Sequence, residues 1–575
     1  MQLSSNALLV LQKRFLTKSK EGVIIEEPED MFSRVARTIS GAERDTSSAE
    51  YEDRFYKIMT NLEFLPNSPT LVNAGRELGM LSACFVLPIE DNMYSIFTTL
   101  RDAIMVQKCG GGTGFNFSNI RPKGDMVKST QKCAGGPVSF IKIFDKSMEP
   151  ISQGGVRRGA NIAILNIEHP DILEFIHCKE DEEILQNFNI SVGISDDFMS
   201  AVKNDRPFDL VNPKNGEIIN TIKATKLFAD ITQHAWQNGE PGVIFLDEIN
   251  RHNVTPHKGN IEATNPCAEE PLLAYESCNL GSLNLGRFVK AKQIDWDRLQ
   301  YVTQLAVRFL DNVIDMNKYP ISQIETQTKM TRKIGLGVMG FADMLIKLDI
   351  SYNTDEAVKK AGEVMKFIYT HAQNTSIELA KTRGVFPAYK GSIWHTEHGI
   401  RLRNACLTAI APTGTLSIIA NCSSGIEPYY SKSTKKHVLE TILEEEVEFA
   451  KEDSFITSHE ITPEWHIRMQ AAFQQHTDGA VSKTINFPES ATIEDVGHAY
   501  MLAFKLKCKG LTIYRDKSRQ KQVLTTEDAT QAQKELNGMV NAYVNEDVCP
   551  QCRKPVIHTE GCVKCTECTW SACKL

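Results

Sequence analysis

The sequence predicts an α/β fold that carries a small cysteine-rich module at its C-terminal end. From about residue 61 to residue 515, short β-like runs alternate with longer helical stretches, which is typical of α/β proteins. Charged residues make up 24% of the chain and apolar residues 42%, which is typical of globular proteins. Six of the 15 cysteines lie in residues 549–575, which predicts metal or redox chemistry there.

Residues 1–60 are predicted to be a helical N-terminal region. Apolar residues recur at helical spacing in two stretches, one with Leu8, Leu11 and Phe15 and the other with Met31, Val35 and Ile39. The first 20 residues contain no continuous apolar segment of the kind that signal peptides have. No run in the chain approaches the ~18–20 apolar residues of a membrane span. We therefore expect a cytoplasmic protein without a membrane partner.

The central region, residues 61–515, contains elements whose limits can be predicted. Val243-Ile244-Phe245 is a candidate buried strand, and Leu407 to Ala411 is another. A helical stripe runs through Ala361, Met365 and Ile368 and is expected to begin at Thr354-Asp355 and end near Gly384.

Residues 516–548 are polar and charged and are predicted to be a linker. Residues 549–575 are too few to hold a core without a metal ion. The net charge of −8 argues against a general nucleic-acid binder, which usually has a basic face.

Gly335 to Gly340 fits the pattern G-x-G-x-x-G of dinucleotide-binding loops. That interpretation requires an apolar strand before the motif, and residues 326–333 are polar and charged. Close packing through small residues is the better prediction.

The segment Asn265-Pro266-Cys267-Ala268-Glu269-Glu270 carries the most chemistry. If it is extended, Asn265, Cys267 and Glu269 project to the same side and present a hydrogen-bond donor, a sulfur and a base. A proline-containing loop with a buried cysteine explains the same residues. The residues alone leave both interpretations open.

The segment and its surroundings resemble ribonucleotide reductases over most of the chain. The motifs that carry the resemblance are, in order, Leu65 to Leu71, Ser82 to Pro88, Gly110 to Phe115, Ser152 to Gly159, Asn265 to Leu272, Ser277 to Leu285 and Ala411 to Thr415. The resemblance implies a ten-stranded α/β barrel with a finger loop through its centre. Ala268 stands where glycine is common in the family.

The resemblance implies a role for each reactive residue. Cys267 becomes a thiyl radical that abstracts the ribose 3′-hydrogen. Glu269 acts as a base on the 3′-hydroxyl, and burial should raise its pKa. Asn265 binds the substrate hydroxyls. Cys84 and Cys278 supply two electrons as the 2′-hydroxyl leaves as water, and they finish as a disulfide.

A phosphate site is expected where the strand Leu407 to Ala411 ends. Proline and glycine turn the chain there and a helix follows, so free backbone N–H groups can face phosphate. An ordinary strand-to-helix turn has the same pattern. The resemblance favours substrate binding by the following residues: Ser68, Ala83, Pro412, Thr413, Gly414 and Thr415. Diphosphate substrates are expected from the family, and triphosphates remain an alternative.

The radical source is expected to be adenosylcobalamin. Thr512 and Ile513 stand where reductases that receive a radical from a partner subunit carry a tyrosine pair. Glu560-Gly561-Cys562 does not match the context of a glycyl radical. The segment Gly510 to Asp516 is similar to the usual ending of the cobalamin-dependent subclass, whose cofactor supplies the radical. Two alternatives stay open, a two-subunit metal-radical reductase and a zinc-ribbon binding protein on an inactive barrel.

The resemblance also implies regulation by dNTP or ATP effectors at the interface of a homodimer. It places Asp91 at the effector's sugar, Arg121 at its phosphates, and Gln153 and Arg157 in a glycine-rich loop that can reorder. A plain surface arginine is the alternative for Arg121.

The cysteine tail predicts a four-thiolate zinc site from its C-x-x-C pairs. Zinc on Cys549, Cys552, Cys562 and Cys565 leaves Cys568 and Cys573, which resembles the C-x4-C reducing tail of related reductases and is the preferred arrangement. The alternative is zinc on Cys549, Cys552, Cys565 and Cys568, which leaves Cys562 and Cys573. The remaining pair is expected to reduce the Cys84–Cys278 disulfide and to be restored by thioredoxin or glutaredoxin. A purely structural zinc ribbon is the simpler alternative.

Overall fold

The computed structural model describes residues 1, 3–43, 47–127, 131–154, 160–181, 183–438, 441–447, 449, 451–518, 524–525, 556–559, 562–565 and 571–573. The chain divides into two compact units. The first comprises Met1–Tyr429 and Lys451–Arg519, and the second comprises Tyr430–Ala450 and Gln520–Leu575. The candidate catalytic residues all lie in the first unit.

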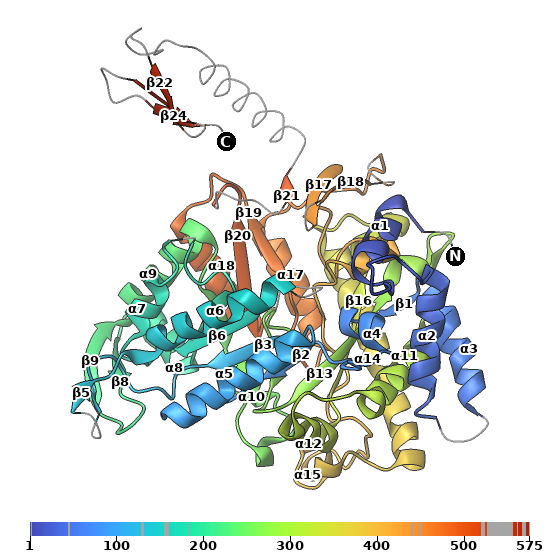
Figure 1. Cartoon of the computed structure of the whole chain (residues 1–575), viewed down its shortest axis with the longest axis horizontal. Helices are drawn as coiled ribbons and strands as arrows, with labels where there is room; N and C mark the ends of the chain where they lie inside the picture. The colour runs from blue at the N-terminus through green and yellow to red at the C-terminus, as the bar shows by residue number, and fades with distance from the viewer. Residues whose placement is uncertain are drawn as a thin grey trace. The chain divides into compact units, whose positions relative to one another are not determined.

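The described helices all belong to the first unit (Figure 1). They are α1 Ser5–Arg14, α2 Pro28–Ser40, α3 Ser47–Thr60, α4 Ser68–Asn73, α5 Met93–Lys108, α6 Gly136–Gly154, α7 Ile172–His177, α8 Asp196–Lys203, α9 Ala224–Asn238, α10 Leu246–Arg251, α11 Trp296–Met316, α12 Ser322–Thr331, α13 Phe341–Lys347, α14 Asp355–Arg383, α15 Ile393–Thr396, α16 Leu416–Ala420, α17 Pro463–Gln474 and α18 Ile493–Lys505, with 3-10 turns η1 Pro256–Lys258, η2 Leu285–Phe288 and η3 Pro387–Tyr389.

The strands divide between the two units. The first contains β1 Phe64–Pro66, β2 Cys84–Val86, β3 Gly112–Asn116, β4 Met126–Val127, β5 Lys132–Cys133, β6 Asn161–Asn166, β7 Phe188–Ile194, β8 Pro207–Val211, β9 Ile218–Lys223, β10 Gly242–Phe245, β11 Ala263–Thr264, β12 Pro271–Leu272, β13 Ser277–Asn284, β14 Val289–Lys290, β15 Gln293–Ile294, β16 Ile334–Met339, β19 Thr484–Phe487 and β20 Gly510–Arg515. The second contains β17 Ser433–Val438, β18 Thr441–Glu446, β21 Leu524–Thr525, β22 Val556–Thr559, β23 Cys562–Cys565 and β24 Ser571–Cys573.

One sheet of ten strands organises the first unit. Strands β2, β3, β6, β7 and β10 are parallel neighbours, and they join β13 on one side and β20 on the other by antiparallel pairing. The segment around Thr408 and Ile410 pairs with Leu336 of β16 and with Val481 just before β19, both in parallel. Since β16 pairs with β13 and β19 with β20, these bridges connect the ends of the sheet into the predicted α/β barrel.

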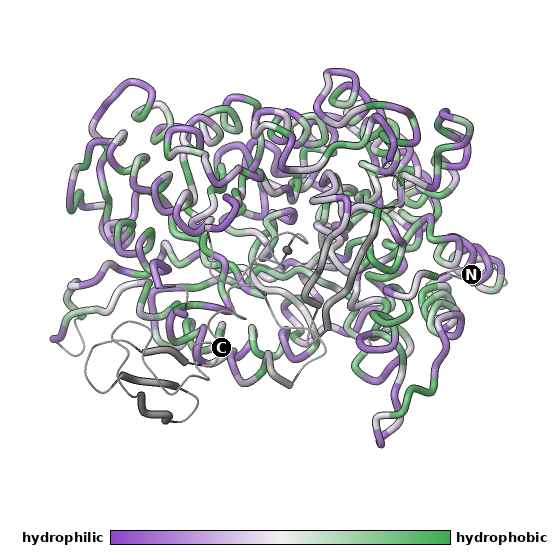
Figure 2. Tube along the Cα trace, turned by 90° about the horizontal axis from the view of Figure 1, so that it is seen from above, coloured by the Kyte–Doolittle hydropathy of each residue, from purple (hydrophilic) through white to green (hydrophobic). Residues whose placement is uncertain are grey.

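Alternating residues of the strands face two different cores. Cys84 and Val86, Ile162 and Ile164, and Ile244 belong to the smaller core inside the barrel. Their neighbours in the chain, such as Phe85, Ala163 and Val243, belong to the larger core beneath the surrounding helices. This is the period-two pattern of strands with both faces covered. Figure 2 shows hydrophilic residues on many of the outer turns.

The predicted helix at Thr354 to Gly384 and the predicted strand at Val243 to Phe245 agree with the structure, whereas the predicted strand at Leu407 to Ala411 is wrong, because this segment forms only isolated bridges at Thr408 and Ile410. The long helix α14 begins after Thr354, whose side chain accepts a hydrogen bond from the Ala357 N–H, and ends before Gly384. Strand β10 covers the predicted residues Val243 to Phe245. Helices α1, α2 and α3 lie in the predicted N-terminal helical region, and α2 and α3 pack on α11. Among the described residues, none of the helices has the length and apolar composition needed to cross a membrane.

In the second unit, β17, β18 and β21 form one small sheet and β22, β23 and β24 form another. Strand β21 falls within the predicted linker 516–548, so this part of the linker pairs with β17. Linker residues 519–523 and 526–548 lie outside the described residues.

Candidate active site

The segment Asn265 to Glu270 is the turn of a β-hairpin inside the barrel. Strands β11 and β12 pair antiparallel, with Ala263 opposite Leu272 and Thr264 opposite Pro271. The Ala268 N–H donates to the Asn265 carbonyl over 2.9 Å, which closes a β-turn with Pro266 in its second position. The Asn265 N–H donates to the Glu270 carbonyl, and the Glu270 N–H donates to Asn265 Oδ1 over 2.9 Å.

Of the two interpretations that the residues left open, the proline-containing loop describes the conformation, because the segment is not extended. Asn265, Cys267 and Glu269 all lie in this turn, so their positions are not set by strand alternation. Ala268 has φ of 64°, the left-handed conformation that glycine adopts without strain. This explains why glycine is common at this position in the family and shows that Ala268 carries a local conformational cost.

Glycines in the barrel wall make room for the hairpin. A Cβ on Gly114 in β3 would lie 1.7 Å from the Thr264 carbonyl oxygen. A Cβ on Gly335 in β16 would lie 2.2 Å from Glu270 Oε1, and one on Gly479 would lie 2.8 Å from the Glu269 carbonyl oxygen. The G-x-G-x-x-G motif is thus a strand that lets the hairpin and a neighbouring segment approach, as the sequence predicted.

Cys84 and Cys278 are direct cross-strand partners in β2 and β13. Side chains at such positions have Cβ atoms about 4.5–5.5 Å apart, close to the separation that a disulfide requires. Both belong to the core inside the barrel, and neither takes part in a disulfide. The structure thus brings together the two cysteines that the sequence assigns to the redox pair.

The hairpin contacts both cysteines. Asn265 Nδ2 lies 3.0 Å from Cys84 Sγ and donates to it. Cys278 Sγ lies 3.0 Å from Glu270 Oε1 and donates to the carboxyl group. Burial and the adjacent Glu270 raise the pKa of Cys278 well above its ordinary value, so this sulfur stays a thiol at neutral pH. Asn265 and Glu269 are each 2% exposed, whereas Cys267 at the turn is half-buried.

Glu270 is a site residue that the sequence analysis did not single out. It is 3% exposed, and burial raises its pKa from 4.5 to about 8 despite the thiol hydrogen bond that opposes the shift. Its carboxyl group is therefore mostly protonated at neutral pH. The available signal was its position beside Glu269, since two adjacent carboxylates in one buried turn cannot easily both ionise.

We predict that Glu270→Gln changes how stability depends on pH. Between pH 4.5 and about 8 the unfolded chain has released this proton while the folded chain keeps it. The free energy of unfolding therefore falls by up to about 1.4 kcal/mol per pH unit across this window, and glutamine removes that loss. As the pH is raised from 5 to 8, the Tm of Glu270→Gln measured by calorimetry should rise relative to the Tm of the parent.

Exposed Glu397→Gln is the matched control and should follow the parent at every pH. If the Glu270→Gln and parent proteins keep a constant Tm difference over this range, the buried, protonated carboxyl group is refuted.

A buried ion pair and a buried lysine stabilise segments next to the strands of the barrel. Lys333 Nζ lies 2.6 Å from Glu276 Oε2, and both side chains are almost fully buried. Lys509 Nζ donates to the carbonyls of Asp478 and Gly479, and burial lowers the pKa of Lys509 to about 8. Glu276 directly precedes β13, which contains Cys278. Gly479 directly precedes Ala480, whose N–H donates to the Glu269 carbonyl.

The predicted phosphate turn follows the Leu407 to Ala411 segment and leads into α16. Thr413 has φ of 52°, a strained conformation for a β-branched residue, and its Oγ1 accepts a hydrogen bond from the Gly425 N–H over 2.8 Å. The Thr413 hydroxyl is therefore used within the protein as an acceptor. Thr415 Oγ1 instead lies 3.3 Å from Arg14 Nη1 of α1, which donates to it.

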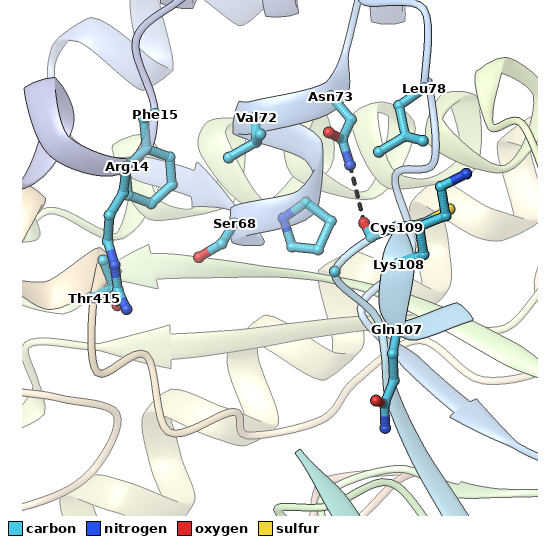
Figure 3. A pocket seen from close by; sticks show the side chains of 12 residues that line it. Arg14, Phe15, Ser68, Val72, Asn73, Leu78, Gln107, Lys108, Cys109 and Thr415 are labelled. Atoms are coloured by element: carbon cyan, nitrogen blue, oxygen red, sulfur yellow. Dashed lines mark hydrogen bonds between the residues drawn. The ribbon is translucent and has the colours of Figure 1, made fainter. Parts of the chain in front are cut away.

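A pocket joins two of the predicted substrate residues, Ser68 and Thr415. Ser68 begins α4, and Arg14, Lys108 and Gly110 also line the pocket. In Figure 3, Arg14 reaches to Thr415 and the Ser68 hydroxyl points toward the side where they lie. Ala83, Pro412, Thr413 and Gly414 do not line it. No pattern in the sequence marks Arg14.

The predicted effector residues are described only in part. Arg121 Nε lies 2.7 Å from Asp91 Oδ2, and the Arg121 N–H also contacts Asp91. Arg121 is thus paired with the very carboxylate that the sequence assigns to the same effector. Gln153 falls in the last turn of α6, and its side chain lies outside the described residues, as does all of Arg157.

The tail is also described in part. Cys549, Cys552 and Cys568 lie outside the described residues. Cys562 and Cys565 are the first and last residues of β23. Cys573 in β24 is the cross-strand partner of Cys562, and Val556 at the start of β22 is the partner of Cys565.

Comparisons with known proteins extend across both parts of the first unit. The family model described as the ribonucleotide reductase all-alpha domain matches residues 1–79, and the barrel-domain model matches residues 82–399, 395–447 and 444–514. The chain is 47% identical to a vitamin B12-dependent ribonucleoside-diphosphate reductase of Thermoplasma acidophilum, over 91% of this chain and 80% of that protein. It is 45% identical to one of Mycobacterium tuberculosis, over 92% and 81%. A ribonucleoside-diphosphate reductase subunit alpha of Chlamydia trachomatis is 30% identical over 71% and 46%.

Proposed function

The chain belongs to the family of vitamin B12-dependent ribonucleoside-diphosphate reductases, and from this premise we propose that it reduces ribonucleotides to 2′-deoxyribonucleotides. The observation that carries the proposal is that the hairpin containing Cys267 forms hydrogen bonds with two facing cysteines. Asn265 donates to Cys84, and Cys278 donates to Glu270. An inactive barrel has no need to keep this set of contacts.

Each residue has a defined part in the proposed reaction. A thiyl radical on Cys267 takes the ribose 3′-hydrogen, and Glu269 removes the 3′-hydroxyl proton while Asn265 binds the substrate hydroxyls. The 2′ carbon–oxygen bond then breaks and the oxygen leaves as water. Cys84 and Cys278 supply the two electrons and become a disulfide. The protonated Glu270 beside Cys278 can supply a proton at this point, and the 3′-hydrogen finally returns from Cys267.

Adenosylcobalamin fits as the radical source on two observations. Thr512 and Ile513, in β20, have no side chain that can carry an electron from a partner subunit. Cys267 is the half-buried residue of a turn whose carboxylates are buried, so a cofactor can approach its sulfur. The cofactor's cobalt–carbon bond supplies the radical. The relatives named for vitamin B12 dependence support this assignment over a two-subunit metal-radical reductase.

The phosphates of the substrate, a nucleoside diphosphate, are proposed to bind in the pocket of Ser68, Thr415 and Arg14. The two hydroxyls and the guanidinium can all donate to phosphate oxygens. The backbone of Pro412 to Gly414 leads into the same site.

Arg14→Gln is predicted to raise KM for the nucleotide about 10- to 100-fold with a small change in kcat. Losing a hydrogen bond to a charged group costs about 1.5–3 kcal/mol, and Arg14 acts on the phosphates and not on the sugar. Lys13→Gln, an exposed neighbour on the same helix, is the control. Steady-state kinetics in which Arg14→Gln keeps the KM of the parent would exclude the pocket as the phosphate site.

The proposed regulation is selection of substrate by dNTP or ATP effectors in a homodimer. Asp91 and Arg121 form the described half of the effector site, with Gln153 and Arg157 as the other half. The 2.7 Å ion pair with Asp91 uses Arg121 Nε, which leaves terminal N–H groups of the guanidinium to bind the effector's phosphates. The proposed partners are thioredoxin or glutaredoxin, with the cytoplasm as the compartment and no nucleic acid.

For the tail we propose zinc on four cysteines and a redox pair on the other two. The register of β23 favours the second of the two arrangements given above. An extended strand places the Cα atoms of Cys562 and Cys565 about 10 Å apart, with their side chains on opposite faces. Two sulfurs bound to one zinc ion lie within about 4 Å of each other, so this pair does not suit a shared zinc ion. Facing Cα atoms in antiparallel strands lie about 4.5–5.5 Å apart, which suits a Cys562–Cys573 disulfide. Zinc then takes Cys549, Cys552, Cys565 and Cys568.

Serine variants separate the two arrangements. Cys573→Ser is predicted to lose repeated turnover with thioredoxin and to keep turnover with dithiothreitol, which reduces Cys84–Cys278 directly. Cys562→Ser should behave in the same way and retain zinc, whereas Cys568→Ser should lose zinc. If Cys568→Ser keeps zinc and fails only with thioredoxin, the C-x4-C pair is the redox pair. If Cys573→Ser turns over like the parent, the tail is purely structural.

The proposed function is tested by a single turnover without external reductant. Cys573→Ser, reduced and freed of reductant, is mixed with adenosylcobalamin, effector and CDP, and the product and the disulfides are then quantified. We expect one dCDP per active chain and a Cys84–Cys278 disulfide found by peptide mass spectrometry. Product without this disulfide, or no product from a folded chain, contradicts the proposal.

A further inference from the structure

A cluster of two histidines and two carboxylates lies between α7 and α9. Glu180 Oε1 is 3.0 Å from His177 Nδ1 and 2.9 Å from His234 Nε2. Asp230 Oδ2 lies 3.6 Å from His177 Nε2. His177 ends α7 and Glu180 follows it by three residues, while Asp230 and His234 are one turn apart on α9. Neither the proposed reaction nor the barrel core uses these side chains.

The orientation of His234 points to a cation in this cluster. Its Nδ1 lies 2.9 Å from the backbone carbonyl of Asp230, which can only accept, so Nδ1 carries the proton. In the neutral ring Nε2 then presents a lone pair to the Glu180 carboxylate at 2.9 Å. Two lone pairs at this distance repel each other unless a proton or a metal ion lies between them.

The same contact is a common arrangement of metal ligands. Histidines that bind metals usually donate their second ring N–H to a carbonyl or carboxylate, which orients the ring. His234 is 5% exposed and so is held in place, whereas His177 and Glu180 are 43% and 57% exposed and can adjust. The ligand atoms of His177, Glu180 and His234 all lie within 4.8 Å of one another.

We propose that His177, Glu180 and His234 form a binding site for a divalent transition-metal ion such as zinc. This site is separate from the cysteine tail. Two imidazole nitrogens and one carboxylate are typical ligands of zinc and its neighbours and not of magnesium or calcium, which prefer oxygen. Tetrahedral ligands at about 2.0–2.1 Å from zinc lie about 3.3 Å apart, so ligand atoms that lie within 4.8 Å of one another need to move by at most about 1.5 Å. A water molecule completes the coordination, and Asp230 faces the second ring nitrogen of His177 and orients that ring.

The ion would connect the end of α7 to α9. Helix α9 also packs on α18 and on β20. Binding at this site should therefore stabilise the folded protein, because a ligand that binds only the native state raises the free energy of unfolding. It should leave the chemistry at Cys267 unchanged.

The test is metal content and thermal stability of the full chain after chelation and reloading with Zn²⁺. His177→Ala and Glu180→Gln alter exposed side chains, and His252→Ala is the matched control because His252 pairs with a single carboxylate, Glu248, at 3.4 Å. We expect both site variants to bind one zinc fewer per chain than the parent and to lose the zinc-dependent rise in Tm that it shows. The control should behave like the parent.

Cobalt loading distinguishes this site from the tail. Thiolate-bound cobalt has strong sulfur-to-metal absorption, whereas a nitrogen and oxygen site has only weak d–d bands. We expect His177→Ala to lose weak bands and keep the thiolate absorption, and His177→Cys to restore one equivalent of metal with new thiolate absorption. If both site variants bind as much zinc as the parent and the control, His234 is protonated on both nitrogens in an ion pair with Glu180, and the proposal is overturned.

Discussion

Replacing Cys267 by serine is expected to reduce deoxyribonucleotide formation at least about a thousand-fold, the loss seen when a group that carries the chemistry is removed. A thiol gives up its hydrogen atom to a carbon radical, and the thiyl radical that remains takes one from the sugar, whereas the stronger O–H bond of serine prevents the first of these steps. Cys267 is half-buried in a turn and serine is close to cysteine in size, so serine should fit without disturbing the fold. Product is measured under anaerobic conditions with dithiothreitol.

Cys133→Ser serves as the control, because Cys133 is an exposed cysteine in β5, outside the hairpin. It should retain the activity of the parent. Substantial product from Cys267→Ser would transfer the radical role to another residue.

Gly114→Ala is expected to cost at least about 100-fold in kcat, although Gly114 touches no substrate. Its Cβ would lie 1.7 Å from the Thr264 carbonyl oxygen, so the hairpin must move by more than 1 Å. A displacement of that size at reacting groups has about this effect on rate. The contact of Asn265 with Cys84 should also be lost, because Thr264 leads directly into Asn265.

Gly362→Ala is the matched control, since a Cβ there meets nothing within 4 Å. It should be active and equal or greater in stability, as alanine favours a helix. Gly112→Ala gives a milder case, with its Cβ 3.0 Å from Pro266 Cγ, and should fall between the two. Full activity in a folded Gly114→Ala protein would contradict the placement of the hairpin.

Local signals in the sequence were sufficient for several elements. The limits of α14 follow from Thr354 as N-cap and Gly384 as terminator, because capping depends on residues within one turn. The order of the reductase motifs supplied the reactive residues and the barrel. Polar residues before Gly335 correctly argued against a dinucleotide loop, although Ile334 to Met339 proved to be a strand.

The conformation of the hairpin could not be predicted from the spacing of Asn265, Cys267 and Glu269. The same three residues share a face in a strand and meet in a turn, and the choice depends on Pro266 and on the left-handed Ala268. The protonation of Glu270 depends on complete burial, which is a property of the closed barrel.

Contacts between distant segments were equally inaccessible. His177 and His234 belong to helices separated by several strands and another helix, and only the packing of α7 on α9 brings them together. Arg14 reaches Thr415 because α1 packs on α16. No spacing rule in the sequence predicts either contact.

The most direct test of the central claim is anaerobic reduction of CDP by the purified chain alone, with dithiothreitol, a panel of dNTPs, and adenosylcobalamin present or absent. The account predicts deoxycytidine nucleotide only when the cofactor is present, at a rate that depends on the dNTP, and none from Cys267→Ser. Product that forms without the cofactor, or none under any of these conditions from a folded chain, would contradict it.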